Sequence, residues 1–183
     1  MKKAIRWLCF LLCLILALNA GTIARLIYPL RHEDIIYEQA GKYNLDPYLL
    51  MGVIKTESNF NEHALSHKNA SGLMQIIEPT ALWLADKMDL TNFSYESICD
   101  PELNISMGSY YVSYLLDRYE DNIKTALAAY NAGMGNVDAW LADTSLSEDG
   151  INLKNIPFPE TKRYVTKVIN SQRMYELLYG DNK

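Results

Sequence analysis

Apolar side chains recur at intervals of three and four residues over most of the chain downstream of residue 31. This spacing is typical of amphipathic helices, in which residues three and four apart lie on one face. The pattern predicts a short helix that ends near Gly41, followed by helices that begin near residues 46, 78, 100, 123, 135 and 160. We therefore predict a mainly α-helical fold.

Several of these helices have clear end signals. Asp46-Pro47 and Asp100-Pro101 each place an N-capping acid directly before a proline, which is favoured in the first helical turn. Gly133 follows the 123–132 segment, as expected of a helix C-cap. We expect the apolar residues of the 78–88 helix and of the final helix to pack inward. They are Ala81, Leu82, Leu84 and Ala85 in the first, and Tyr164, Val165, Val168, Ile169 and Leu177 in the second.

One acidic residue continues an apolar stripe. Glu57 lies seven residues after Leu50, four after Val53 and three after Ile54, so a helix that buries these side chains also carries the Glu57 carboxyl to the edge of the core. Burial disfavours the charged form, which raises the pKa towards the value that a general acid needs. The alternative is a glutamate whose stem lies on the core while its carboxylate reaches water.

The N-terminal segment differs from the rest of the chain. Lys2, Lys3 and Arg6 precede an uncharged, almost wholly apolar run over 7–24, which is 18 residues long. That length is near the lower limit for a helix that crosses a bilayer of ~30 Å. The basic residues before the run favour a cytoplasmic N-terminus.

We therefore predict that residues 1–31 form a signal-anchor with a short linker, and that 32–183 form one domain outside the cytoplasm, attached to the membrane by an N-terminal hydrophobic helix. The alternative is a cleaved signal peptide and a secreted or periplasmic domain, although Leu18-Asn19-Ala20 is a poor cleavage site.

Composition and charge indicate the number of domains and exclude one class of partner. A chain of 183 residues with 49% hydrophobic content can bury one core. The net charge of −5 argues against nucleic acid as a partner, because phosphate binding needs a basic surface. Cys9 and Cys13 lie in the apolar run, so Cys99 has no disulfide partner within the domain.

The segment 59–71 is polar and predicts a loop close to Glu57. Ser66 and Ser71 can hydrogen-bond a sugar or its acetamido group, or can simply stabilise turns. His63 and His67 are four residues apart, a spacing that suits a metal only on a helix. Because they lie in a polar loop without a third ligand, we predict no metal and no cofactor.

Four blocks in order carry a family resemblance. They are Glu57-Ser58, the segment 70–75 (ASGLMQ), the segment 129–133 (AYNAG) and the segment 160–165 (ETKRYV). Together they resemble the soluble lytic transglycosylase (SLT) catalytic domain over roughly residues 33–178. The resemblance implies a lysozyme-like, goose-type helical domain with a substrate cleft, acting on the glycan strands of bacterial peptidoglycan.

The resemblance also implies roles for individual residues. Glu57 is the expected catalytic acid. The expected substrate-binding or supporting residues are Ser58, Ser66, Ser71, Met74, Gln75, Tyr130, Asn131, Glu160 and Tyr164. From the pattern alone Tyr130 and Tyr164 are equally well explained as packed aromatics, and Glu160 as an acid stabilised by a helix N-terminus.

The count of carboxylates bears on the mechanism. Most glycosidases use two, and neither Glu62, Glu78 nor Asp86 is a convincing partner for Glu57. The family's chemistry needs only one acid, since it closes a 1,6-anhydro ring on N-acetylmuramic acid. Two rival interpretations are a hydrolase of the same bond and a weakly active wall-binding or assembly protein. A protein partner in the cell-wall or envelope machinery is compatible with enzymatic activity.

Overall fold

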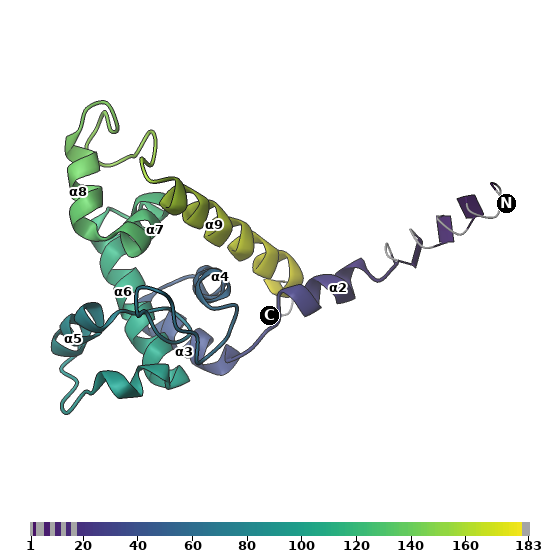
Figure 1. Cartoon of the computed structure of the whole chain (residues 1–183), viewed down its shortest axis with the longest axis horizontal. Helices are drawn as coiled ribbons and strands as arrows, with labels where there is room; N and C mark the ends of the chain where they lie inside the picture. The colour runs from purple at the N-terminus through teal and green to yellow at the C-terminus, as the bar shows by residue number, and fades with distance from the viewer. Residues whose placement is uncertain (1, 3–5, 8–9, 12–13, 16–17, 181–183) are drawn as a thin grey trace.

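A computed structural model describes residues 2, 6–7, 10–11, 14–15 and 18–180, and Figure 1 shows their arrangement. The described residues form helices and loops with two isolated β-bridges and no strand, as the apolar pattern predicts. The helices are α2 (Ala20–Ile27), α3 (Glu33–Tyr43), α4 (Pro47–Glu57), α5 (Glu78–Lys87), α6 (Pro101–Arg118), α7 (Ile123–Ala132), α8 (Met134–Ala142) and α9 (Pro159–Tyr179), with the short 3-10 helix η1 (Tyr95–Cys99).

Helix α4 is the central element of the core. The Asp46 carboxylate accepts a hydrogen bond of 2.9 Å from the Tyr48 amide, which caps the helix as predicted. Residues 49–54 are all buried, and α4 packs mainly against α9. The two backbones meet at Gly52, where an added Cβ would lie only 2.8 Å from the Val168 carbonyl oxygen. This close approach brings the end of α4, which carries Glu57, beside α9.

Two of the expected core positions are wrong. Leu82 is 51% exposed and Leu177 is 74% exposed. Each lies off the buried face of its helix, because Leu82 is one residue after the buried Ala81 and Leu177 is two residues after the buried Tyr175. Successive helical residues are rotated by about 100°. The prediction placed these two leucines in the core because they are hydrophobic, without regard to their position around the helix.

The remaining helix boundaries agree closely with the pattern. Gly133 caps the end of α7, as predicted, and also precedes α8. Helix α3 continues to Tyr43 instead of ending near Gly41, and the sequence pattern did not predict η1.

The N-terminal part of the described chain projects from the helical domain (Figure 1). No residue of α2 is buried. Much of the expected leader over residues 1–31, including Cys9 and Cys13, lies outside the described residues, so the leader stays a prediction. Among the described residues, no helix combines the length and apolarity that a membrane crossing requires. Cys99 is a free, partly buried thiol.

Candidate active site

A cleft with a volume of about 320 Å³ lies at the C-terminal end of α4. The loop after α4, the first turn of α5, helix α6, the end of α7 and the first turn of α9 form its walls. Its lining residues are Glu57, Ser66, His67, Lys68, Ala70, Gln75, Ile76, Ile77, Thr80, Tyr111, Tyr130, Asn131, Ala132, Gly133 and Glu160. Segments far apart in the sequence thus meet around one carboxyl group.

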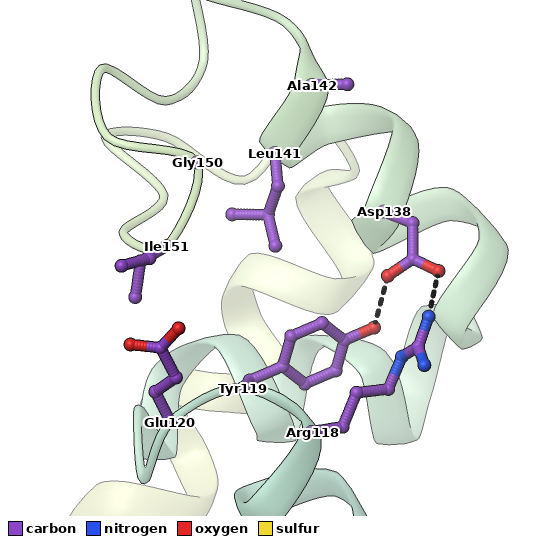
Figure 2. Close-up of a pocket in the computed structure, with 8 residues that line it drawn as sticks. All are labelled: Arg118, Tyr119, Glu120, Asp138, Leu141, Ala142, Gly150 and Ile151. Atoms are coloured by element: carbon purple, nitrogen blue, oxygen red, sulfur yellow. Dashed lines mark hydrogen bonds and ion pairs between the residues drawn. The ribbon is translucent and has the colours of Figure 1, made fainter.

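A second hollow, of about 500 Å³, lies between the ends of α6 and α8 (Figure 2). Two of its charged groups pair with each other: Asp138 accepts hydrogen bonds from Arg118 at 2.7 Å and from the Tyr119 hydroxyl at 2.9 Å. None of the site residues expected from the sequence lines it. Despite its smaller volume, the cleft at Glu57 is therefore the candidate active site.

The pKa of Glu57 is raised from 4.5 to about 7. Burial is the main cause, because the wall of the cleft removes water from the carboxylate, and the neighbouring Tyr164 hydroxyl lowers the pKa only in part. A carboxyl group with such a pKa is substantially protonated near neutral pH. The raised pKa expected from the apolar stripe is confirmed.

Three tyrosine rings stand in a row beside Glu57. The ring of Tyr130 lies 5.1 Å from that of Tyr111 and is stacked on that of Tyr164 at 6.5 Å. Burial and then the charge of Glu57 raise the pKa of both Tyr130 and Tyr164 well above the usual value. Both hydroxyls therefore stay protonated, so they are available only as neutral donors at neutral pH.

The Tyr130 hydroxyl donates a hydrogen bond of 2.7 Å to the Met74 carbonyl oxygen. The Tyr164 hydroxyl is buried beside Glu57 but has no well-formed hydrogen bond. Tyr130 therefore fixes the 72–75 turn against α7, whereas the Tyr164 hydroxyl lies next to the acid and lowers its pKa.

Buried Asn104 in α6 fixes the 72–75 turn through hydrogen bonds. Its Nδ2 donates to the carbonyl oxygens of Ile98 at 2.8 Å and Ser71 at 3.2 Å, and its Oδ1 accepts from the Met74 amide at 2.7 Å. Gly72 has a φ of +82°, and an added Cβ there would lie 2.2 Å from the Asn104 amide nitrogen. The turn therefore requires both the glycine and the asparagine.

Sequence analysis missed Asn104, although a signal was present. Asn104 lies three residues before Met107 and seven before Tyr111, so it interrupts the apolar stripe of α6 with a polar side chain. A buried amide at such a position must be hydrogen-bonded to be tolerated. Tyr111, on the same face of α6, lines the cleft.

Ser66 and Gln75 line the cleft and also stabilise its wall. The Ser66 hydroxyl oxygen accepts hydrogen bonds from the amides of Ala70 at 3.0 Å and Lys68 at 3.2 Å. The Gln75 Nε2 donates to the carbonyl oxygens of Ala64 and Gly72, both at 2.9 Å. The loop thus uses one side of each group, which leaves the Ser66 hydroxyl hydrogen and the Gln75 amide oxygen for a ligand.

Ser58, Ser71 and Met74 do not line the cleft. The Ser58 hydroxyl donates to the Ile54 carbonyl oxygen at 3.2 Å, the Ser71 amide donates to the Ile76 carbonyl oxygen at 3.2 Å, and Met74 is completely buried. Ser58 lies directly after Glu57, and Ser71 and Met74 lie in or beside the 72–75 turn. A role in supporting the acid and this turn stays a prediction for all three.

Asn131 and Glu160 form the far edge of the cleft. The Thr161 hydroxyl donates to the Asn131 Oδ1 at 2.8 Å, which ties the end of α7 to the start of α9. The Glu160 carboxylate lies 3.9 Å from the Lys68 ammonium group, with side chains that are 66% and 63% exposed. This pair joins the α9 side of the cleft to the opposite loop. Nothing in the polar 59–71 pattern singled out Lys68.

Among the described residues, Glu57 and Glu160 are the two carboxyl groups that line the cleft. Glu160 is exposed and paired with Lys68, and Glu62 lies 3.2 Å from the His32 ring nitrogen outside the cleft. Glu78 and Asp86 do not line the cleft. Among the described residues, the cleft therefore holds one partly buried carboxyl group with a raised pKa, Glu57, and one exposed carboxylate, Glu160.

The raised pKa predicts a stability cost. The unfolded chain ionises Glu57 freely, so the parent loses folding stability as pH rises from 4.5 to about 7. We expect Glu57→Gln, which stays neutral, to be more stable than the parent by about 3 kcal/mol at pH 8 and by almost nothing at pH 4. Urea unfolding at both pH values measures this. A difference that does not change with pH would contradict the raised pKa.

Known proteins are similar to this chain in sequence and in fold. The sequence matches the family described as "Transglycosylase SLT domain" over residues 34–151, more than half of the chain. The soluble lytic murein transglycosylase of Escherichia coli (strain K12) is 31% identical over 156 residues, which cover 84% of this chain and 24% of that protein. The membrane-bound lytic murein transglycosylase C of Histophilus somni (strain 2336) is 30% identical over 169 residues, which cover 81% of this chain and 47% of the relative.

Solved structures extend the match to the fold. The 70-kDa soluble lytic transglycosylase of Escherichia coli superposes with a TM-score of 0.75 at 30% identity, covering 84% of this chain and 25% of that one. An inactive glutamate-to-glutamine mutant of the lytic transglycosylase Slt from Pseudomonas aeruginosa gives a TM-score of 0.72 at 30% identity, covering 82% and 24%.

This chain therefore spans about a quarter to a half of the length of these relatives. The expected fold class, the lysozyme-like helical domain of these transglycosylases, is confirmed. The four sequence blocks, the cleft that they surround and the shared fold agree: the chain belongs to the transglycosylase SLT domain family.

Proposed function

We propose that this protein is a peptidoglycan lytic transglycosylase that cleaves the β-1,4 bond between N-acetylmuramic acid and N-acetylglucosamine. The observation that carries the proposal is the Glu57 carboxyl group, whose pKa is about 7 and which lines the cleft. Among the described residues, the other carboxyl group of the lining, Glu160, is exposed. Membership of the SLT family and relatives that bear the name lytic murein transglycosylase support it.

The proposed reaction uses Glu57 twice. The neutral acid donates its proton to the glycosidic oxygen as the bond from that oxygen to C1 of N-acetylmuramic acid breaks, and the acetamido group stabilises the positive charge at C1. The Glu57 carboxylate then accepts the proton of the C6 hydroxyl, whose oxygen attacks C1. The product carries a 1,6-anhydro ring, no water is consumed, and Glu57 is again neutral. A pKa near the working pH suits a group that must give and then take a proton.

Labelled water tests this reaction against hydrolysis of the same bond. With peptidoglycan digested in water enriched in heavy oxygen, we expect no label at the new muramic acid ends, because the attacking oxygen comes from the sugar. Incorporation of one heavy oxygen atom per cleaved bond would identify a hydrolase and would exclude the proposed ring closure.

Tyr130→Phe is expected to reduce kcat by about tenfold, because it removes the hydroxyl that holds the Met74 carbonyl oxygen. A lost hydrogen bond of about 1.4 kcal/mol corresponds to that factor. Initial rates of anhydro-product release measure the effect. Tyr110→Phe is the matched control, since it removes a tyrosine hydroxyl from a residue that does not line the cleft. Equal rates in both variants would return Tyr130 to a packing role.

We also propose that the domain acts outside the cytoplasm and is attached to the membrane through its apolar N-terminal segment. The run over 7–24 and the exposed apolar side chains of α2 support this. Fractionation of cells followed by mass measurement of the protein tests it. We expect the full-length chain in the membrane fraction, whereas a shortened chain in the soluble fraction would identify a cleaved signal peptide.

A further inference from the structure

The segment that follows α2 is fastened to the C-terminal end of α9. The Tyr175 hydroxyl donates to the Pro29 carbonyl oxygen at 3.1 Å, and the Tyr179 hydroxyl donates to the Tyr28 carbonyl oxygen at 2.7 Å. The rings of Tyr28 and Tyr175 also meet edge to face, with centroids 5.5 Å apart. Two backbone carbonyl groups of the segment are therefore held by two side chains of one helix.

Two basic side chains fasten the last turn of α2. The Arg25 guanidinium group lies 5.8 Å from the centre of the Tyr179 ring and donates to the Leu178 carbonyl oxygen at 3.2 Å. The Lys55 ammonium group donates to the Ile27 carbonyl oxygen and to the Asn59 side chain. Lys55 thus links α2 to the helix that ends in Glu57. We call Arg25, Tyr28, Lys55, Tyr175 and Tyr179 the clasp.

The tyrosines of the clasp lie in the domain core or pack against it. Tyr175 is completely buried, and Tyr28 and Tyr179 pack against the hydrophobic core. Burial also lowers the pKa of Lys55. A flexible tether would instead leave its backbone in water and its ends free to move. The clasp contacts lie outside residues 34–151, the part of the chain that matches the family, except for Lys55.

Helix α9 connects the clasp to the cleft. Glu160 in its first turn lines the cleft, and Tyr179 in its last turn belongs to the clasp. At 1.5 Å per residue the helix separates the two by about 30 Å. Figure 1 shows α2 leaving the domain at the C-terminal end of α9, away from α8.

The exposed face of α2 fits a lipid bilayer. Leu26 is 77% exposed, Ile27 is 53% exposed and Leu18, just before the helix, is 76% exposed. Arg25 is the sole charged side chain of α2, and the clasp engages it. Exposed apolar side chains continuing an apolar run of this length match hydrocarbon better than a polar protein surface.

We propose that the clasp makes a rigid mount, so that a bilayer holding the N-terminal segment faces the C-terminal end of α9, about 30 Å along that helix from Glu160 at the edge of the cleft. The inference rests on the proposed membrane attachment. It adds that the orientation of the cleft is fixed by side chains, and that residues 28–31 act as part of the domain and not as a tether.

Distances between spin labels on the full-length chain in phospholipid vesicles test the mount. With Cys9, Cys13 and Cys99 replaced by serine, labels at Ala20→Cys in α2 and Thr144→Cys after α8 report on their relative motion. We expect a single narrow distance peak, as narrow as that of a pair within the domain, Lys42→Cys and Thr144→Cys. Combining Lys55→Met, Tyr175→Phe and Tyr179→Phe should broaden the peak, because the rings remain while three donors are lost.

Tyr95→Phe is the matched control, because its hydroxyl bonds to Asn69 and Ile76, far from the clasp in sequence. It should leave the α2 distance unchanged. A broad α2 distribution in the parent chain would overturn the rigid mount, and a narrow one in the triple variant would overturn the assignment to the clasp. Flotation of the same vesicles measures membrane attachment, and digestion of peptidoglycan measures enzymatic activity. Failure of the proposed attachment or activity can therefore be distinguished from failure of the rigid mount.

Discussion

Replacing Glu57 by glutamine is expected to reduce the release of anhydromuropeptides by at least about 10³-fold, in the range typical of losing a general acid or base. Glutamine keeps the shape of the side chain in the cleft but has no proton to donate and cannot accept one from the C6 hydroxyl. Glu160, the other carboxyl group that the described residues place in the cleft, is exposed and paired with Lys68, so it cannot replace Glu57. Turnover should collapse while binding of glycan strands survives.

Two measurements check this expectation. Mass spectrometry of the released products gives the rate, and sedimentation with insoluble peptidoglycan gives the binding. Glu96→Gln in η1, an exposed glutamate outside the cleft, is the matched control and should retain the parent rate. A Glu57→Gln protein with the parent rate would show that Glu57 is not the acid. Loss of binding in parallel with the rate would indicate a damaged cleft instead.

Asn104→Ala is expected to lower the free energy of unfolding by about 3 kcal/mol, from three lost hydrogen bonds and the polar groups left unpaired. The side chain is completely buried and bonds to Ile98, Ser71 and Met74. Because the Asn104 side chain fixes the 72–75 turn, we expect the enzymatic activity to fall as well. Urea unfolding at neutral pH measures the stability.

Asn170→Ala provides the matched control for this substitution. Asn170 lies on the exposed face of α9, so its truncation should change the free energy of unfolding by less than about 0.5 kcal/mol. If Asn104→Ala proved as mild as Asn170→Ala, the turn would have to be held by its own backbone, and the role given to Asn104 would be wrong.

The helices were predictable from the sequence because their determinants are local. Asp46 and Pro47 start α4 through contacts within one turn, and Gly133 ends α7 in the same way. The raised pKa of Glu57 was predictable for a related reason, since its position on the stripe of Leu50, Val53 and Ile54 already places it at the core.

The contacts that close the cleft were not predictable, because they join distant segments. Asn104 reaches the Met74 amide across 30 positions, and Tyr130 reaches the Met74 carbonyl oxygen across 56. The clasp between Tyr28 and Tyr179 spans 151 positions. Periodicity shows that a face is buried but not which element buries it. The roles of Tyr130 and Glu160 came from the family resemblance, since their local pattern fits packing or capping equally well.

We propose that a single acid, Glu57, cleaves peptidoglycan and closes a 1,6-anhydro ring on N-acetylmuramic acid. The most direct test of this proposal is the mass of the muropeptides released from purified peptidoglycan by the parent protein and by Glu57→Gln under identical conditions. We expect products one water lighter than hydrolysis products from the parent, and none from the variant. Hydrated reducing ends from the parent, or anhydro products from Glu57→Gln at the parent rate, would contradict it.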